Sequence, residues 1–322
     1  MKNVIVIFFL FLLSSCATKM PLSDDPDIAK LQTQVEGRKL ASINIIDRNG
    51  LSETIGAKER VKTYENIDFL SSQSYQKVLR IFSRDSTGKT FAVITSYHPS
   101  GQIKQYLEVV NGRANGTYLE WHQNGEKKLK TEVLGGNADL DEKSQSGWTF
   151  DSTSYCWNES GALVAQIQYE KGQLVGCAKY FHADGSLAEQ VPYEKGEIHG
   201  EMVTFDTDGT VLEKTSFSSG LKEGPSVGFW GLDKAAWNEV WHEDLLQEGS
   251  YYDRSGSLVS QVIEGNGQRS IFSDTSLSEQ HEYRQGKEEG QVLIFNEQQQ
   301  LVQTVHVKDG MKHGEEIYYW TA

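Results

Sequence analysis

Basic residues and prolines are scarce in this sequence. It has 322 residues, and 31 lysines and arginines stand against 45 aspartates and glutamates, which gives a formal net charge of −14. Nucleic-acid binding rewards clustered Lys and Arg, so the acidic excess argues against a nucleic-acid partner. Hydrophobic residues make up only 38%, which excludes a polytopic membrane protein, whereas 11% aromatic residues are too many for a disordered chain. The 30 glycines against five prolines indicate many turns and a repetitive β-protein.

Long apolar runs are also missing, because the run near the start of the chain, Val4–Leu13, has only ten residues. At about 1.5 Å per residue it spans roughly half of a ~30 Å hydrocarbon core, which is typical of a signal peptide rather than a membrane span. The residues Leu13-Ser14-Ser15-Cys16 resemble the lipobox of bacterial lipoproteins. An ordinary signal peptide that is cleaved elsewhere, with a chance cysteine at this place, is the alternative.

The lipobox resemblance implies that residues 1–15 are removed and that the sulfur of Cys16 carries a diacylglycerol. Such acyl chains anchor a protein stably to a bilayer. Ala17 follows the cysteine, and an Asp there would resemble the inner-membrane retention signal. We therefore expect the protein in the bacterial cell envelope, at the periplasmic side of the outer membrane. Residues 16–40 are polar and are predicted to form a flexible acylated tether.

A spacing of 24 residues organises the rest of the chain. Three columns of glycine keep this spacing: Gly161, Gly185 and Gly209; Gly172, Gly196 and Gly220; and Gly176, Gly200 and Gly224. A large, mostly aromatic side chain stands four residues before the first glycine of each unit, at Tyr97, Trp121, Trp157, Phe181, Phe205, Phe229, Tyr252, Ile271, Phe295 and Tyr319. One step is longer because of an insertion, Asn137–Trp148, and the step that ends at Ile271 is shorter.

Each unit has the local chemistry of a β-hairpin. The tip His182–Ser186, with the sequence His-Ala-Asp-Gly-Ser, is typical of a type I turn that ends in a left-handed glycine. This three-residue loop places Phe181 opposite Leu187, so the aromatic and leucine columns are predicted to share one face of the sheet. Leu187, Val191 and Tyr193 alternate with other residues, which predicts that all three lie on that face.

The unit reads roughly aromatic-x-x-(Asp/Asn)-Gly-x-Leu-x5-Tyr-x-x-Gly-x-x-x-Gly, and it resembles the variant MORN repeat of the YwqK-type family, whose members often carry an antitoxin label. The resemblance covers about Ser96 to Trp320, and its best copies are Ala178–Gly200 and Glu201–Gly224. It implies an all-β fold, an elongated antiparallel β-meander of MORN-like hairpin repeats. Two tips depart from the pattern, with Asp233 and Gln299 in place of the turn glycine.

The region before the repeats, residues 41–95, is predicted to be a small β-containing cap, because the end units of a repeat array need covering. Strands are expected at Ser42–Ile46, Lys77–Phe82 and Thr90–Tyr97, and a short helix is expected over Ala57–Leu70. The repeat domain then spans residues 96–320.

No constellation of residues predicts catalysis, and neither a cofactor nor a metal site is expected. His98, His122 and His182 share one repeat position, and neighbouring copies would lie about 10 Å apart, which is awkward for a shared metal ion. They are interpreted as surface histidines inherited with the repeat. Cys156 and Cys177 are predicted to lie on opposite faces and a strand apart, which argues against a disulfide bond.

Two features break the repeat and are therefore candidates for binding a partner. One is the insertion, which ends in Trp148, and the other is the tryptophan cluster Trp230, Trp237 and Trp241. A bulge or a domain bend would explain both without any partner. The aromatic column is a further candidate, as a stacking platform for glycans or peptides, although such columns are more often the core side of a sheet.

The sequence predicts a non-catalytic, membrane-anchored repeat scaffold that binds a protein or an envelope polymer, with the lipid bilayer as a partner through Cys16. A sheet with one apolar column exposes more apolar surface than a monomer usually leaves bare, so a partner, a homo-oligomer or self-curling is expected. An antitoxin-like or immunity-like protein that neutralises one toxin is the alternative. An envelope hydrolase built around His242, Glu243 and Asp244 is a third hypothesis.

Overall fold

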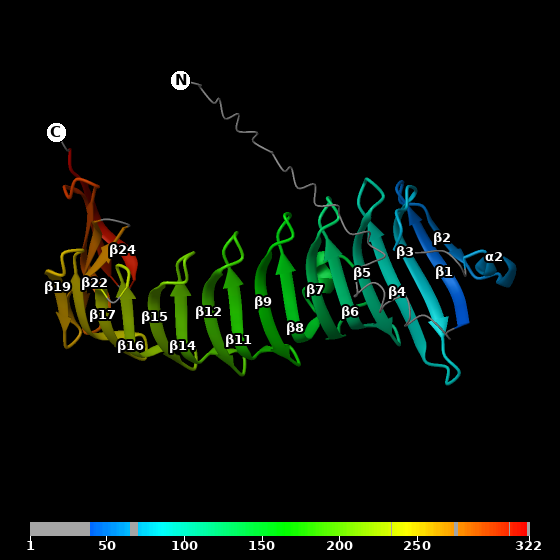
Figure 1. The fold of residues 1–322 in the computed structure, drawn as a ribbon, viewed down its shortest axis with the longest axis horizontal. Helices are drawn as coiled ribbons and strands as arrows, with labels where there is room; N and C mark the ends of the chain where they lie inside the picture. Colours follow the sequence, from blue (N-terminus) through cyan, green and yellow to red (C-terminus); the bar gives the residue numbers. More distant parts are fainter. Residues whose placement is uncertain (1–38, 65–69, 233, 274–275, 309, 321–322) are drawn as a thin grey trace, which may run out of the picture.

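A computed structural model describes residues 39–64, 70–232, 234–273, 276–308 and 310–320 of the chain. The predicted signal peptide, the lipidation site Cys16, most of the predicted tether and Asp233 lie outside these residues. The described chain forms one 24-stranded antiparallel sheet, and from β3 onward the strands follow one another in chain order (Figure 1). The predicted all-β class and the β-meander are thereby confirmed.

The N-terminal part of the sheet begins with β2, which pairs with β1, and β1 pairs with β3. From β3 onward each strand pairs with its neighbour in the chain. The elements of this part are β1 (Lys39–Asp47), β2 (Ser52–Ile55), α2 (Lys58–Lys62), β3 (Gln76–Arg84), β4 (Thr90–Tyr97), β5 (Ile103–Val110), β6 (Arg113–Trp121), β7 (Lys127–Gly135) and α3 (Glu142–Gln145).

The middle part of the sheet contains two strands that are each interrupted by one residue, so β10 and β11 continue each other, as do β13 and β14. Its strands are β8 (Thr149–Trp157), β9 (Leu163–Glu170), β10 (Gln173–Leu174), β11 (Gly176–Phe181), β12 (Leu187–Glu194), β13 (Glu197–Ile198), β14 (Gly200–Phe205), β15 (Val211–Ser218) and β16 (Leu221–Phe229). The C-terminal strands are β17 (Ala235–His242), β18 (Leu245–Tyr252), β19 (Leu258–Ile263), β20 (Asn266–Phe272), β21 (Leu277–Arg284), β22 (Lys287–Phe295), β23 (Leu301–Lys308) and β24 (Met311–Tyr318).

Two boundaries of the N-terminal cap differ from the prediction. β1 begins at Lys39, within the predicted tether, because it continues to pair with β3 as far as Arg84. The helix ends at Lys62, although it was predicted to reach Leu70. Val61 is the one buried residue of this helix, and so short a helix depends on packing rather than on propensity.

The hairpin tips have the predicted geometry. The backbone N–H of His182 donates to the carbonyl oxygen of Ser186 at 2.9 Å, and Gly185 has a left-handed φ of 88°. Gln299 adopts a φ of 61° and so takes the place of the turn glycine at its tip. The predicted aromatic–aliphatic pairs are all present: Phe181 with Leu187, Tyr97 with Ile103, Trp157 with Leu163, Phe205 with Val211, Tyr252 with Leu258 and Phe295 with Leu301.

The aromatic column runs along one face of the sheet, as predicted. Lys179 pairs with Gln190, and Gln190 pairs with Val203. Phe181 and Phe205, two positions beyond Lys179 and Val203, therefore lie on the same face. We call this face the column face and the other one the second face.

A β-bulge follows each aromatic–aliphatic pair. Phe181 pairs with Leu187, but Tyr180 pairs with Glu189, so Ala188 is an extra residue. An extra residue reverses the alternation of side chains beyond it. The equivalent extra residues of the other hairpins are Lys104, Lys128, Val164, Leu212, Ala236, Val259, Ser278 and Val302.

The bulge divides the apolar residues of each hairpin between the two faces. Ala178 is three positions before Phe181 on the same strand, so it lies on the second face. Val191 pairs with Ala178 and therefore lies on the second face too, as does Tyr193, two positions further on. The prediction that Leu187 shares a face with these two residues was therefore wrong. The alternation in the sequence does not reveal the bulge, because the extra residue looks like any other strand residue.

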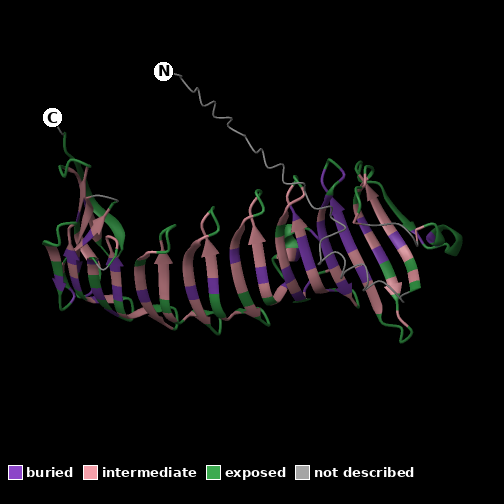
Figure 2. Ribbon diagram, in the orientation of Figure 1, coloured by how far each residue is buried: buried purple, intermediate pink, exposed green. Residues whose placement is uncertain are grey.

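The N-terminal part of the sheet has a core on each face. Tyr97 and Ile103 belong to the cluster on the column face, against which Tyr64 and Leu70 also pack. Leu107 belongs to a separate cluster on the second face, where Leu140 and Trp148 of the insertion cover the sheet. Burial is therefore dense around β4 to β7 and sparser in the middle strands (Figure 2).

The shortened unit shifts the aromatic column by one residue. Phe272 pairs with Leu277, and Ile271 pairs with Glu279, so Phe272 occupies the column in place of the predicted Ile271. The hydrogen bond that closes this tip joins Ser273 to Ser276, one residue fewer than in the other tips. Ile271 was predicted by the repeat spacing, since it stands 15 positions before Gly286, as Phe181 does before Gly196. That spacing could not show that one residue is missing from the tip that follows.

The C-terminal part of the sheet curls on itself, with the second face inside. Arg269 on β20 lies 2.7 Å from a carboxylate oxygen of Glu239 on β17, although two strands separate them in the sheet. The backbone N–H of Leu246 donates to the carbonyl oxygen of Gly286 at 3.0 Å. Self-curling was one of the three expected ways of covering the apolar surface, and the buried side chains that it encloses are Trp241, Leu246, Tyr251, Val262 and Tyr283.

Candidate binding groove

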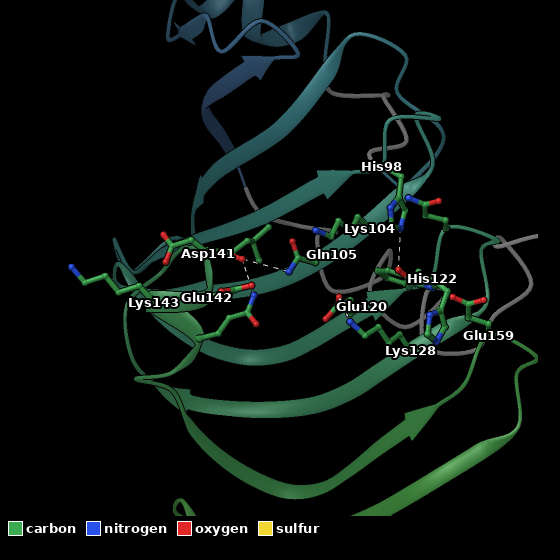
Figure 3. A pocket seen from close by; sticks show the side chains of 14 residues that line it. His98, Lys104, Gln105, Glu120, His122, Lys128, Asp141, Glu142, Lys143 and Glu159 are labelled. Atoms are coloured by element: carbon green, nitrogen blue, oxygen red, sulfur yellow. Dashed lines mark hydrogen bonds and ion pairs between the residues drawn. The ribbon is translucent and has the colours of Figure 1, made fainter. Parts of the chain in front are cut away.

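A groove of about 980 Å³ lies on the second face, between the insertion and the tips of the N-terminal hairpins (Figure 3). The insertion places α3 along one side of the groove, and β5, β6 and β7 form its floor. The bulge residues Lys104 and Lys128 line the groove, because each bulge turns the lysine side chain to the second face. At the tips it is lined by His98, His122 and Glu159.

The floor of the groove holds a hydrogen-bonded chain of polar side chains. Gln105 accepts from the hydroxyl of Ser96 at 2.7 Å and donates to the hydroxyl of Tyr118 at 3.0 Å. Tyr118 in turn donates to Glu120 at 3.2 Å, and Lys128 lies 2.8 Å from the same carboxylate. Burial, and then the charge of Glu120, raise the pKa of Tyr118 far above its usual value. Tyr118 therefore stays a protonated donor that fixes the Glu120 carboxylate.

The histidines at the tips tie neighbouring hairpins together. Nε2 of His98 donates to the carbonyl oxygen of Trp121 at 3.0 Å, and Nε2 of His122 donates to that of Trp157 at 2.9 Å. A carbonyl oxygen can only accept, so Nε2 carries the hydrogen, and Nδ1 of the neutral ring is an acceptor. His98 is buried, so the interpretation of these residues as surface histidines was wrong for it. The bonds to the next hairpin explain why this position favours histidine.

The insertion is fixed firmly to the sheet. Arg80 on β3 makes two 3.0 Å contacts with the carboxylate of Asp139, and the side chain of Asp141 caps α3 by accepting from the backbone N–H of Ser144. The indole N–H of Trp148 donates to the carbonyl oxygen of Asn137, which closes the insertion. Trp148 is 8% exposed and belongs to the wall that supports the groove rather than to its surface.

The other three tryptophans of the predicted binding set lie at the C-terminal part of the sheet, away from Trp148. Trp241 is 8% exposed and faces Gly224, just as Tyr193 faces Gly176 in the repeat 48 residues earlier. Its indole N–H donates to Glu239 at 2.9 Å. Trp241 therefore follows the repeat instead of breaking it, and the 24-residue spacing could have shown this.

Trp230 and Trp237 also occupy repeat positions. Trp230 stands 48 residues after His182 and replaces its hydrogen bond, because its indole N–H donates to the carbonyl oxygen of Tyr252 at 2.9 Å. Trp237 pairs with Gly228, and its ring fills the space that a side chain at Gly228 would need. The structure thus gives each of these tryptophans a packing role.

The polar cluster of the hydrolase hypothesis joins a turn to a neighbouring strand. Nδ1 of His242 lies 3.1 Å from a carboxylate oxygen of Glu223, and the other oxygen accepts from the backbone N–H of Glu243 at 2.8 Å. Asp244 accepts from the backbone N–H of Lys222 at 2.7 Å. The hydrogen bonds to Glu243 and His242 lower the pKa of Glu223, and the bond to Glu223 raises the pKa of His242. These contacts connect the β17–β18 turn to β16.

Cys156 and Cys177 are free thiols, as predicted. β9 lies between their strands, since it pairs with both β8 and β11. Burial raises the pKa of Cys156. Within the described residues, no group of three or more His, Cys, Asp or Glu side chains is placed to hold a metal ion. In that part of the chain, no helix combines the length and apolarity that crossing a membrane requires.

Comparison with known protein families identifies one repeat type in the chain. Residues 174–195, which include the whole of β11 and β12, match the MORN repeat variant. No curated protein matches the chain.

Solved structures give only distant likenesses. The crystal structure of TcdB2-TccC3 without its hypervariable C-terminal region is 11% identical, with a TM-score of 0.16, and the match covers 84% of this chain and 16% of that one. The crystal structure of TcdB2-TccC3-Cdc42 is 12% identical, with a TM-score of 0.12, and covers 84% and 21%. This chain thus spans about a fifth or less of those chains, and at such TM-scores neither carries an inference. The repeat match and the all-β repeat architecture point to a scaffold or binding role.

Proposed function

We propose that this protein is a non-catalytic, membrane-anchored repeat scaffold that holds a component of the cell envelope in the groove beneath its insertion. The MORN repeat match and the long single sheet support a scaffold. The observation that carries the proposal is the insertion itself, because it breaks the repeat, is held by Arg80 and Trp148, and forms one wall of the groove.

The membrane anchor is proposed from the lipobox at Cys16, and the outer membrane from Ala17. A Cys16→Ala variant is expected to leave the membrane fraction, because without the cysteine sulfur no diacylglycerol can be attached to the protein. Fractionation and labelling with a radioactive fatty acid would compare this variant with the wild type. An unchanged membrane fraction would contradict the anchor but not the groove.

The groove is tested with a photo-cross-linking amino acid introduced into the full-length protein in intact cells. Gln123 lines the groove at a tip, and Gln298, at the tip of a distant hairpin, is the matched control. We expect an adduct from position 123 that is absent from position 298. Equal labelling at both positions, or none at position 123, would overturn the proposal. An adduct with one soluble protein would favour the antitoxin-like alternative, and an adduct with a second copy would indicate a homo-oligomer.

A further inference from the structure

The charges of the groove are nearly balanced. Three lysines line it, Lys104, Lys128 and Lys143, and four carboxylates lie among them, including Glu120 and Glu159. A polyanion would meet the carboxylates and a polycation would meet the lysines, and like charges brought together cost free energy. The groove is therefore suited to a ligand without net charge.

The groove offers fixed hydrogen-bonding groups of both kinds. The Glu120 carboxylate is held by Tyr118 and Lys128, and Nδ1 of His122 is an acceptor because Nε2 is bonded to a carbonyl oxygen. Lys104 is half-buried and has no hydrogen bond or ion pair with any other described residue, so its ammonium group is available as a donor. Hydroxyl groups both donate and accept, and a polyhydroxylated ligand can satisfy all of these groups at once.

Apolar and peptide ligands fit the groove less well. The ring of Trp148 is buried in the wall, and Trp121, although it lines the groove, is only 2% exposed, so the groove offers little aromatic surface to an acyl chain. Extended peptides are commonly bound by adding a strand to an open sheet edge. The floor offers no such edge, because β5, β6 and β7 each pair with a strand on both sides.

We propose that the groove binds a short stretch of a neutral glycan chain. The inference rests on the proposed function and names the chemistry of its ligand. The volume, about 980 Å³, lies at the upper end of the range for ligand sites and gives room for several sugar residues. The anchored Glu120 and His122 accept from sugar hydroxyls, and Lys104 donates to them.

The test measures binding of three neutral tetrasaccharides, chitotetraose, cellotetraose and maltotetraose, to the full-length protein in detergent by isothermal titration calorimetry. We expect saturable binding of at least one of them. Lys104→Met is expected to weaken it about tenfold or more, the usual effect of losing a hydrogen bond to a charged group. Lys179→Met is the matched control, because Lys179 is a half-buried strand lysine on the column face outside the groove. It is expected to bind like the wild type.

Absence of saturable binding to all three saccharides would overturn the inference, and so would an equal loss in both variants. Tetra-alanine and inorganic polyphosphate are the competing probes, and binding of either one in place of the saccharides would contradict a neutral glycan. The cross-link at position 123 would still stand in that case, so failure of the ligand class is distinguishable from failure of the proposed function. Should Lys104→Met fail to fold, Lys104→Gln replaces it, because it also removes the ammonium charge and so weakens the hydrogen bond to a sugar hydroxyl; weaker saccharide binding is again expected.

Discussion

The imidazole of His182 donates a hydrogen bond from Nε2 to the carbonyl oxygen of Phe205, 3.0 Å away at the tip of the next hairpin. Trp230 makes the same connection to Tyr252 with its indole N–H. Each bond joins two neighbouring units at the tip edge of the sheet. No other described element covers the middle strands, so such nearest-neighbour bonds contribute directly to cohesion between repeats there.

Replacing His182 with Ala is expected to lower the free energy of unfolding by about 1 kcal/mol, the usual net value of one hydrogen bond. Urea denaturation measures the change, and hydrogen exchange should rise first in β11 and β14. His313→Ala is the control, because His313 is exposed and lies near the end of the described chain. An equal effect of the two substitutions would contradict the role of the tip hydrogen bond.

Gly200→Ala is expected to destabilise the protein by about 1 to 3 kcal/mol, because it imposes a strained backbone. Gly200 has a φ of 113°, and an added Cβ would lie 3.2 Å from Cγ of Pro192. Gly135→Ala is the control, since Gly135 also lies in a strand but has no positive φ and open space around its Cβ position. Thermal unfolding would compare them, and equal melting temperatures would refute the expected strain.

Arg269→Met is expected to cost about 3 to 5 kcal/mol, because it leaves a buried carboxylate without its cationic partner. The side chain of Glu239 is 1% exposed and lies 2.7 Å from Nε of Arg269. Arg284→Met is the matched control, because Arg284 pairs with Glu282 near the surface, where such pairs contribute about 0 to 1 kcal/mol. Chemical denaturation measures both changes. Similar losses in the two variants would show that the curl does not depend on the buried pair.

The pair of His242 and Glu223 is expected to be most stabilising in weak acid. The raised pKa of His242 means that its contribution is complete below the usual value of 6.5 and is lost as the pH rises through the folded-state pKa. The lowered pKa of Glu223 means that its contribution is present above 4.5 and is lost on acidification. The favourable window therefore lies between about pH 4.5 and 6.5.

An NMR titration of His242 checks this window. The midpoint in the wild type is expected above the usual value, because Glu223 favours the charged imidazolium. Glu223→Gln removes the charge and keeps a hydrogen-bonding oxygen, so the midpoint should fall towards the usual value. A midpoint that is unchanged in this variant would contradict the assignment of the shift to Glu223.

The register of the hairpins was predictable because it is local. Five residues separate Phe181 from Leu187, and the turn chemistry of these five determines which residues pair. The bulge at Ala188 was not predictable from alternation alone, which is why Val191 and Tyr193 were assigned to the wrong face. The curl joins Glu239 to Arg269, 30 residues apart, and no local pattern contains that contact.

The sequence predicted the candidate site only as a place where the 24-residue repeat is interrupted. The insertion Asn137–Trp148 stood out because it breaks the 24-residue spacing, and it does form one wall of the groove. The residues that face the groove were missed, because Lys104 and Lys128 look like ordinary strand lysines until their bulges are known. Trp148, which was singled out because it ends the insertion, is buried behind the wall.

The bare middle of the sheet acts as a spacer of adjustable length. Each repeat adds two strands at about 4.8 Å, so one more copy of residues 178–201 would move the two ends apart by roughly 10 Å. Among the described residues, the covered N-terminal block and the C-terminal curl contact these repeats through adjacent strands. Whole units can therefore be gained or lost without remodelling either end, and the reach of the molecule is set by how many it has.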